Sequence, residues 1–135
     1  LQRAATAGGS RAVLNAAATL VNAPRRASQG DASAALALLL AAARPQDVTS
    51  GVHEATRALE ADREEVAREL EMARRVAPVF AGSMALLRIH SRCQVHPLVA
   101  QAWTGRLRQH VVLAANSGYR DGFVHVAVRS ATGAR

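Results

Sequence analysis

The sequence predicts an α/β fold in which a helical N-terminal linker is followed by a small mixed β-sheet domain with a crossover helix. Two patterns predict it. Before Pro78, apolar residues recur at three-to-four spacing between helix-capping and helix-ending signals. From Met84 to Ser130, three β-like runs accompany one helix-like run and a Gly-rich turn. The 135 residues suffice for one domain, or for a small domain with a helical extension.

The first 50 residues predict two helices. Ser10 is placed to cap a helix over Arg11–Asn22, and Asp31 is placed to cap a second over Ala32–Ala43. A proline follows each helix and ends it, because proline cannot continue the helical hydrogen bonding. The second helix is apolar nearly all round, which predicts packing on several sides.

A long helix is predicted over Gly51–Ala77. Val52, Leu59, Val66 and Ala73 recur at intervals of seven residues, and several opposite charges lie three or four residues apart. At about 1.5 Å per residue this helix would be about 40 Å long. Such a helix suits a strut between two lobes, and a coiled-coil dimerisation arm is the alternative.

The C-terminal block predicts a mixed sheet. We expect a turn over Phe80–Ser83, strands over Met84–His90, His110–Ala115 and Phe123–Arg129, and a helix over Leu98–Arg108 with Pro97 at its first position. The crossover helix makes the first two strands parallel. Turn signals at residues 116–118 and 121–122 then return the third strand antiparallel to the second.

Alternation in the last predicted strand separates two faces. The valines at 124, 126 and 128 share one face, which we assign to the core. His125 and Arg129 share the other face with Phe123 and Ala127, so they should be presented together, on the outer face or in a cleft.

Positive charge is concentrated in the same block. Residues 1–78 carry 10 Arg and 9 acidic residues, whereas residues 79–135 carry 7 Arg and 1 acidic residue. The second segment therefore has a net charge of +6 and suits a phosphate-bearing partner. All 17 basic residues of this Ala-rich chain are Arg, so coding bias is the competing explanation.

Cysteine content and hydropathy argue against disulfides, Cys-based zinc sites and membrane spans. A single cysteine, Cys93, leaves no internal disulfide and no Cys-based zinc site, and favours a reducing, cytoplasmic setting. We interpret Cys93 as a small buried hydrophobe. The longest apolar run, Ala34–Ala43, is too short to span a bilayer, and no signal peptide is apparent, so no membrane is expected as a partner.

No complete catalytic constellation is present. No acidic cluster lies outside the long helix, and there is no Ser/His/acid order and no nucleotide-binding glycine motif. What remains is a set of donors that can grip a phosphate: Asn116, Tyr119, Arg120, His125, Arg129 and Ser130. The alternative is an exposed hairpin with ordinary polar residues. Trp103 fits the core better than a base-stacking platform.

Four short runs carry a resemblance to a known family: His96–Ala100, Gly105–Leu107, Val111–Ala114 and Val126–Ser130. Together they resemble the DHH-associated C-terminal domain of DHH-family phosphoesterases, in the RecJ-like branch that includes single-strand-specific exonucleases. Upstream, Asn15–Ala17 and the apolar helix resemble the segment that follows the catalytic domain, and the long helix resembles the connector between the lobes.

The resemblance implies a domain organisation. Residues 1–50 would follow a missing N-terminal catalytic lobe, residues 51–78 would be the connector helix, and residues 79–135 would be a truncated DHH-associated substrate-binding domain. The glycine-rich motif that follows the Arg-Ser strand in this family is absent from the 135 residues. The chain alone should therefore lack activity and hold no cofactor, although the parent enzyme would use manganese or magnesium.

The resemblance also implies a ligand. The parent would hydrolyse phosphodiester bonds in single-stranded nucleic acid or small nucleotides, and Arg129 with Ser130 would contact substrate phosphate. We add Asn116 and His125 to this substrate-binding set because they lie in the same block. The alternative function is a non-enzymatic helical interaction or dimerisation module, and a homodimer is an open expectation.

Overall fold

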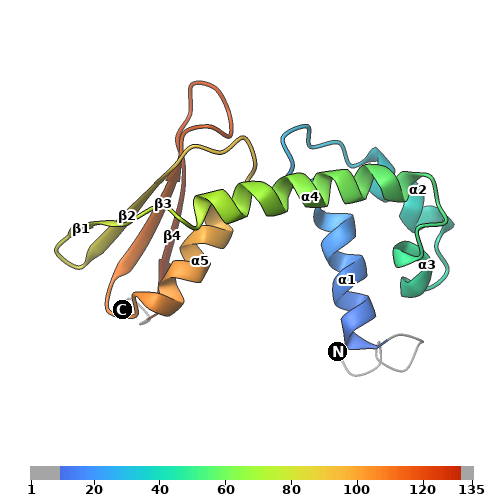
Figure 1. Cartoon of the computed structure of the whole chain (residues 1–135), viewed down its shortest axis with the longest axis horizontal. Coiled ribbons are helices and arrows are strands. Elements are labelled where there is room, and N and C mark those ends of the chain that lie inside the picture. The colour runs from blue at the N-terminus through green and yellow to red at the C-terminus, as the bar shows by residue number, and fades with distance from the viewer. Residues whose placement is uncertain (1–9, 132–135) are drawn as a thin grey trace. The chain divides into compact units, whose positions relative to one another are not determined.

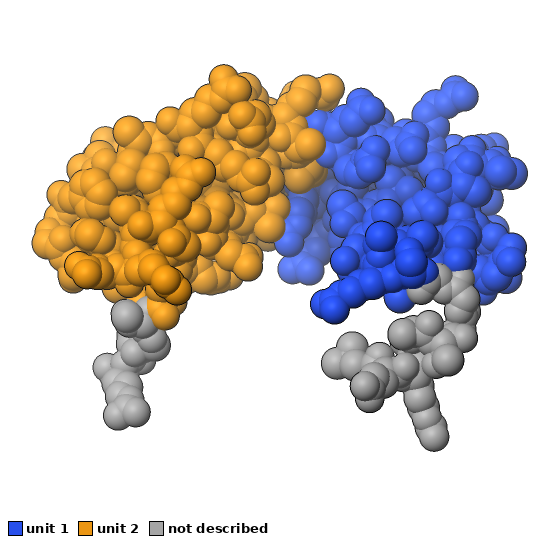
Figure 2. All heavy atoms as spheres, turned by 60° about the horizontal axis from the view of Figure 1, so that its bottom comes forward, with its two compact units in different colours: residues 1–65 blue, residues 66–135 orange. Residues whose placement is uncertain are grey.

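The structure, a computed structural model, describes residues 10–131. It has an α/β fold with a helical N-terminal part and a four-stranded mixed sheet, which confirms the predicted fold class. The chain divides into two compact units, residues 1–65 and residues 66–135 (Figure 2). The boundary between them falls inside one helix, α4 (Ala55–Ala73).

Three helices and the first part of α4 build unit 1. They are α1 (Arg11–Asn22), α2 (Ser33–Ala41) and α3 (Pro45–Thr49), and α1 packs against α3. The core contains Ala17, Leu20, Ala35, Leu38, Val48 and Leu59. The side chain of Ser10 accepts a hydrogen bond from the backbone N–H of Val13, as a capping residue should. The predicted cap at Asp31 is wrong, because α2 begins at Ser33 and Ala32 is its N-cap residue; the Asp31 carboxylate accepts the N–H of Ser33 at 2.8 Å from one residue before the cap.

The prediction that the second helix is packed on several sides is wrong. Only Ala35 and Leu38 of α2 are buried. Leu36, Leu39 and Leu40 are exposed, and Leu40 keeps 80% of its surface. The sequence could not show this, because a run of Ala and Leu presents an apolar surface in every direction and does not indicate which side has a neighbour.

The long helix is shorter than the sequence predicted. It begins at Ala55 rather than Gly51, because Gly51 adopts a positive φ of 74° and the Nδ1 atom of His53 accepts the N–H of Ala55 at 3.0 Å. Its 19 residues give about 28 Å. Leu59, Val66 and Ala73 of the expected seam are buried within the described chain.

The sheet of unit 2 has the strand order β1-β2-β3-β4 (Figure 1). The strands are β1 (Val79–Ala81), β2 (Met84–Ile89), β3 (Val111–Asn116) and β4 (His125–Ser130), and α5 (His96–Arg106) connects β2 to β3. β2 and β3 are parallel, and β4 is antiparallel to β3, as predicted. The helix begins two residues before Leu98, and Pro97 lies in its first turn.

The predicted turn over Phe80–Ser83 is wrong in part. Val79–Ala81 forms a strand that pairs antiparallel with β2, and only Gly82 and Ser83 make the turn. Gly82 has a φ of 56°, which suits a two-residue hairpin turn. Three residues are too few for alternation to reveal a strand.

The core assignment of the last strand is also wrong. Val124, Val126 and Val128 are exposed, and Val128 keeps 50% of its surface, whereas Ala127 is buried. The reason is that α5 packs against β3 and β4 (Figure 1), and the buried side chain of Ala127 belongs to the face that this helix covers. A small side chain there lets the helix approach closely, and alternation alone cannot say which face a helix covers.

The uncovered face, called here the open sheet face, consists of three rows of residues that pair across the strands. They are Ala81, Met84, Val111 and Ser130 in the first row, Val79, Leu86, Leu113 and Val128 in the second, and Arg88, Ala115 and Val126 in the third.

A matched pair of substitutions tests this orientation. Val112 is fully buried, so Val112→Thr should lower the free energy of unfolding by about 1–3 kcal/mol, because it buries a hydroxyl. Val128→Thr should stay within about 0.5 kcal/mol of the wild type, because this site is half exposed. Urea unfolding at low protein concentration measures both. The reverse order of effects would mean that the valine face is the core.

Candidate functional site at the carboxyl edge of the sheet

Asn116 organises the edge where β2 and β3 end. It is the last residue of β3 and is fully buried. Its Oδ1 atom accepts the N–H of Ser91 at 2.9 Å and the N–H of Gly118 at 3.1 Å, and its Nδ2 atom donates to the carbonyl of Cys93 at 3.1 Å. Since backbone groups occupy both of its polar atoms, Asn116 has a structural position, which does not suit the expected contact with phosphate.

Gly118 lets the two loops of this edge touch. A Cβ atom at this position would lie 2.8 Å from the backbone nitrogen of Ser91, closer than real Cβ contacts. The N–H of Ser117 donates to the carbonyl of Ile89 at 3.0 Å, and the Ser117 hydroxyl lies 3.1 Å from Nδ1 of His90. The loop after β3 is therefore fastened directly onto the loop after β2.

Glu69 of α4 holds the loop after β2 from another side. The Ser91 hydroxyl donates to Oε2 of Glu69 at 2.5 Å and accepts the N–H of Cys93 at 3.1 Å. The guanidinium of Arg92 lies 3.9 Å from the other carboxylate oxygen. Cys93, which the sequence assigned as a buried hydrophobe, is fully buried in this loop.

Four rings, those of His96, Tyr119, Phe123 and His125, cluster at this edge of the sheet. The ring centroid of His125 is 5.0 Å from that of Tyr119 in an edge-to-face arrangement, 5.9 Å from that of His96, and 6.3 Å from that of Phe123. The guanidinium of Arg120 lies 5.4 Å from the Tyr119 ring. Aromatic and cationic groups therefore converge on the loop that joins β3 to β4.

These rings differ in their access to ligand. His96 is buried, His125 and Tyr119 are half-buried, and Phe123 keeps 68% of its surface. The Nδ1 atom of His125 is buried and makes no hydrogen bond with the described residues. Phe123 and Arg120 are consequently the parts of the group that a ligand can reach first.

The start of α5 is not a phosphate cradle, although it lies at this edge. Pro97 has no N–H, and the N–H groups of Leu98 and Val99 both donate to the carbonyl of Val95 at 3.0 Å. Few backbone donors remain in the first turn to face an anion. Side chains must therefore supply any phosphate contact here.

The predicted site residues do not form one group. His125 pairs with Asn116 at the carboxyl edge, whereas Arg129 pairs with Val112 and Ser130 with Val111 at the other end of β3. Four residues of strand separate His125 from Arg129 by about 13 Å. Arg129 is exposed, and its guanidinium donates to the carbonyl of Val128 at 2.8 Å.

Two ring residues, His96 and Phe123, were not among the predicted site residues. His96 directly precedes the proline that opens α5, and Phe123 directly follows a turn glycine, so their positions next to these signals were the only available clue. Trp103 is half-buried, and its ring centroid lies 5.2 Å from the guanidinium carbon of Arg106. Both residues belong to α5.

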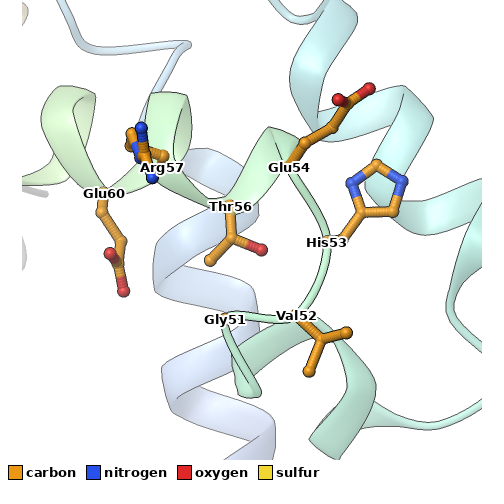
Figure 3. A pocket seen from close by; sticks show the side chains of 7 residues that line it. All are labelled: Gly51, Val52, His53, Glu54, Thr56, Arg57 and Glu60. Carbon is orange, nitrogen blue, oxygen red and sulfur yellow. The ribbon is translucent and has the colours of Figure 1, made fainter.

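A separate cavity of about 490 Å³ lies in unit 1 at the start of α4. Its lining includes His53, Glu54, Thr56 and Glu60. Figure 3 shows the carboxylates of Glu54 and Glu60 pointing in opposite directions. The charged groups therefore do not converge on a common point, and this cavity is not a second candidate site.

Metal ligands and membrane spans are absent from the part of the chain that the structure describes. Residues 10–131 contain no group of three or more His, Cys, Asp or Glu side chains placed to hold a metal ion. Among the described helices, none combines the length and the apolar character needed to cross a bilayer.

Comparisons with models of protein families, with curated proteins and with solved structures find no match to this chain.

Two glycines provide a matched test of the loop contact. Gly118→Ala should lower the free energy of unfolding by about 1–3 kcal/mol, because its methyl group would overlap the backbone at Ser91. Gly105→Ala is the control, since its Cβ would meet open space within α5, and it should raise stability by up to about 1 kcal/mol. Thermal or urea unfolding of both variants measures these changes in the free energy of unfolding. Equal effects would contradict the loop contact.

Proposed function

We propose that residues 66–135 hold a phosphate-bearing ligand, either a nucleotide or a single-stranded nucleic acid. The observation that carries the proposal is the convergence of Arg120, Tyr119, Phe123 and His125 at the carboxyl edge of the parallel strands. Ligands of open sheets with parallel strands bind outside this edge. Exposed aromatic rings next to Arg are what single-stranded nucleic acids use, because bases stack on the rings and phosphates meet the cations.

The charge distribution supports the same ligand class. The net charge of +6 over residues 79–135 favours a polyanion and would make its binding salt-dependent. Arg120 and Arg129 lie toward opposite ends of the strand region, and a ligand that meets both must span more than one phosphate group. This favours an oligonucleotide over a mononucleotide.

In this proposal the chain binds and does not cut. It is the substrate-binding part of a phosphodiester hydrolase similar to the RecJ-like DHH phosphoesterases, acting in a reducing cytoplasm. The metal-dependent hydrolysis belongs to the parent's catalytic lobe. The chain's own residues contribute by stacking a base on Phe123 and pairing phosphate oxygens with Arg120, and Arg129 extends the contact along β4.

The alternative is a non-enzymatic interaction or dimerisation module. The predicted seam of α4 does not favour it, because Leu59, Val66 and Ala73 are already buried within the chain. The exposed leucines of α2 favour association through a different surface.

Binding of a short fluorescent single-stranded oligonucleotide tests the proposal. Arg120→Ala and Arg129→Ala should each weaken binding by about 1.5–3 kcal/mol, roughly ten- to hundredfold, because each removes a charge-assisted phosphate contact. Each variant should also reduce the slope of log K against log salt concentration by about 0.7. Fluorescence anisotropy at two salt concentrations measures both quantities.

Arg57→Ala is the matched control, because it removes the same charge from an exposed position in unit 1. It should leave the affinity unchanged. No binding by the wild type, or an equal loss in the Arg57 variant, would contradict a specific site.

A further inference from the structure

The open sheet face is a continuous apolar surface. The row of Val79, Leu86, Leu113 and Val128 crosses all four strands without a polar residue. In the neighbouring row, Arg88 is followed by Ala115 and Val126. Exposed valines and Met84 add to this surface. In the described chain α5 packs against one face of the sheet and leaves this face open.

The size of this surface sets a limit on what it can contribute. Strands spaced about 4.8 Å apart at about 3.3 Å per residue, three of them six residues long and β1 three, give a face on the order of 330 Å². An apolar patch of this size is comparable with the largest one on a typical monomer, which is often functional. The open sheet face therefore calls for a covering element.

Helix α2 has the complementary surface. Leu39 and Leu40 lie three and four residues after Leu36, so all three belong to one exposed side of the helix. No residue of Ser33–Ala41 is charged. A helix with such a stripe is stable in water only when the stripe is covered, and a flat apolar sheet is one of the surfaces that cover it.

We propose that a second copy of this chain supplies the cover. In a closed two-fold pair, α2 of each copy lies across the open sheet face of the other copy. The leucines of α2 contact the row that contains Leu113 and Val128, and neither surface remains in water. This association is separate from the ligand site at the carboxyl edge.

Buried area favours the reciprocal arrangement. One α2–sheet contact buries at most about 330 Å² on each partner, a total of about 660 Å², which gives only weak association. Two such contacts give up to about 1,300 Å², within the range of specific, stable interfaces. A closed pair with both contacts is therefore the stable form, and a pair with one contact is a weak form that assembles only at higher concentration.

Charge favours α2 over a second sheet as the cover. Residues 79–135 carry 7 Arg and 1 acidic residue, so stacking two sheet faces would bring two basic units together. Helix α2 is uncharged, and its last carbonyls carry the partial negative charge of a helix C-terminus. In the proposed pair the C-terminus of α2 lies next to Arg88, so the partial negative charge of its carbonyls faces the exposed guanidinium of the open sheet face.

The test uses the whole chain and three variants. The wild type should dimerise with increasing concentration in sedimentation velocity. Val126→Glu places a charge on the open sheet face, and Leu40→Glu places one on the α2 stripe, so each variant alone should weaken dimerisation at least tenfold. Val52→Glu is the control, because Val52 is an exposed valine outside both surfaces, and it should dimerise like the wild type.

Mixing the two variants gives the decisive result. Each variant retains the surface that the other has lost, so an equimolar mixture should form a heterodimer through one intact contact, more weakly than the wild type. This rescue also shows that both variants are folded. The proposal is overturned by a wild type that stays monomeric, by a mixture that stays monomeric, or by a Leu40→Glu variant that still dimerises fully while Val126→Glu does not.

Discussion

The side-chain amide of Asn116 is the interaction on which the C-terminal unit depends. It binds two backbone N–H groups and one backbone carbonyl, and these belong to the loop after β2 and the loop after β3. Both loops leave the sheet at the same edge, where strand pairing no longer satisfies their backbone groups. A buried amide has both a donor and an acceptor, so one residue satisfies groups that would each cost about 1–3 kcal/mol if left unpaired.

The position of the rings follows from this framework. Because the loop after β3 is fastened to the loop after β2, Tyr119 and Arg120 are held at the carboxyl edge beside His125 at the start of β4. Glu69 of α4 fixes the loop after β2, because its carboxylate accepts a hydrogen bond from the Ser91 hydroxyl. The aromatic and basic groups that can meet a ligand therefore stand on a framework of buried hydrogen bonds, which limits their freedom before a ligand arrives.

The sequence predicted the parts of the fold that depend on local signals. The helix over Arg11–Asn22, the parallel pair and the returning strand all follow from caps, prolines and turn residues. It did not predict which strand face is covered, because that depends on where α5 packs. The sequence did not predict the buried hydrogen bonds of Asn116 for a similar reason: a turn asparagine and an asparagine in a buried network have the same sequence signal. Arg129 and His125 share a strand face, as expected, but strand length separates them.

The thiol of Cys93 lies fully buried inside the loop that Asn116 and Ser91 hold. A thiol reagent can reach this sulfur only after the loop has opened, since reaction requires an accessible thiolate. The rate of alkylation therefore reports how often the chain around Cys93 opens, through local opening or through global unfolding. Alkylation of this single cysteine therefore measures opening of the loop beside the residues that would contact a ligand.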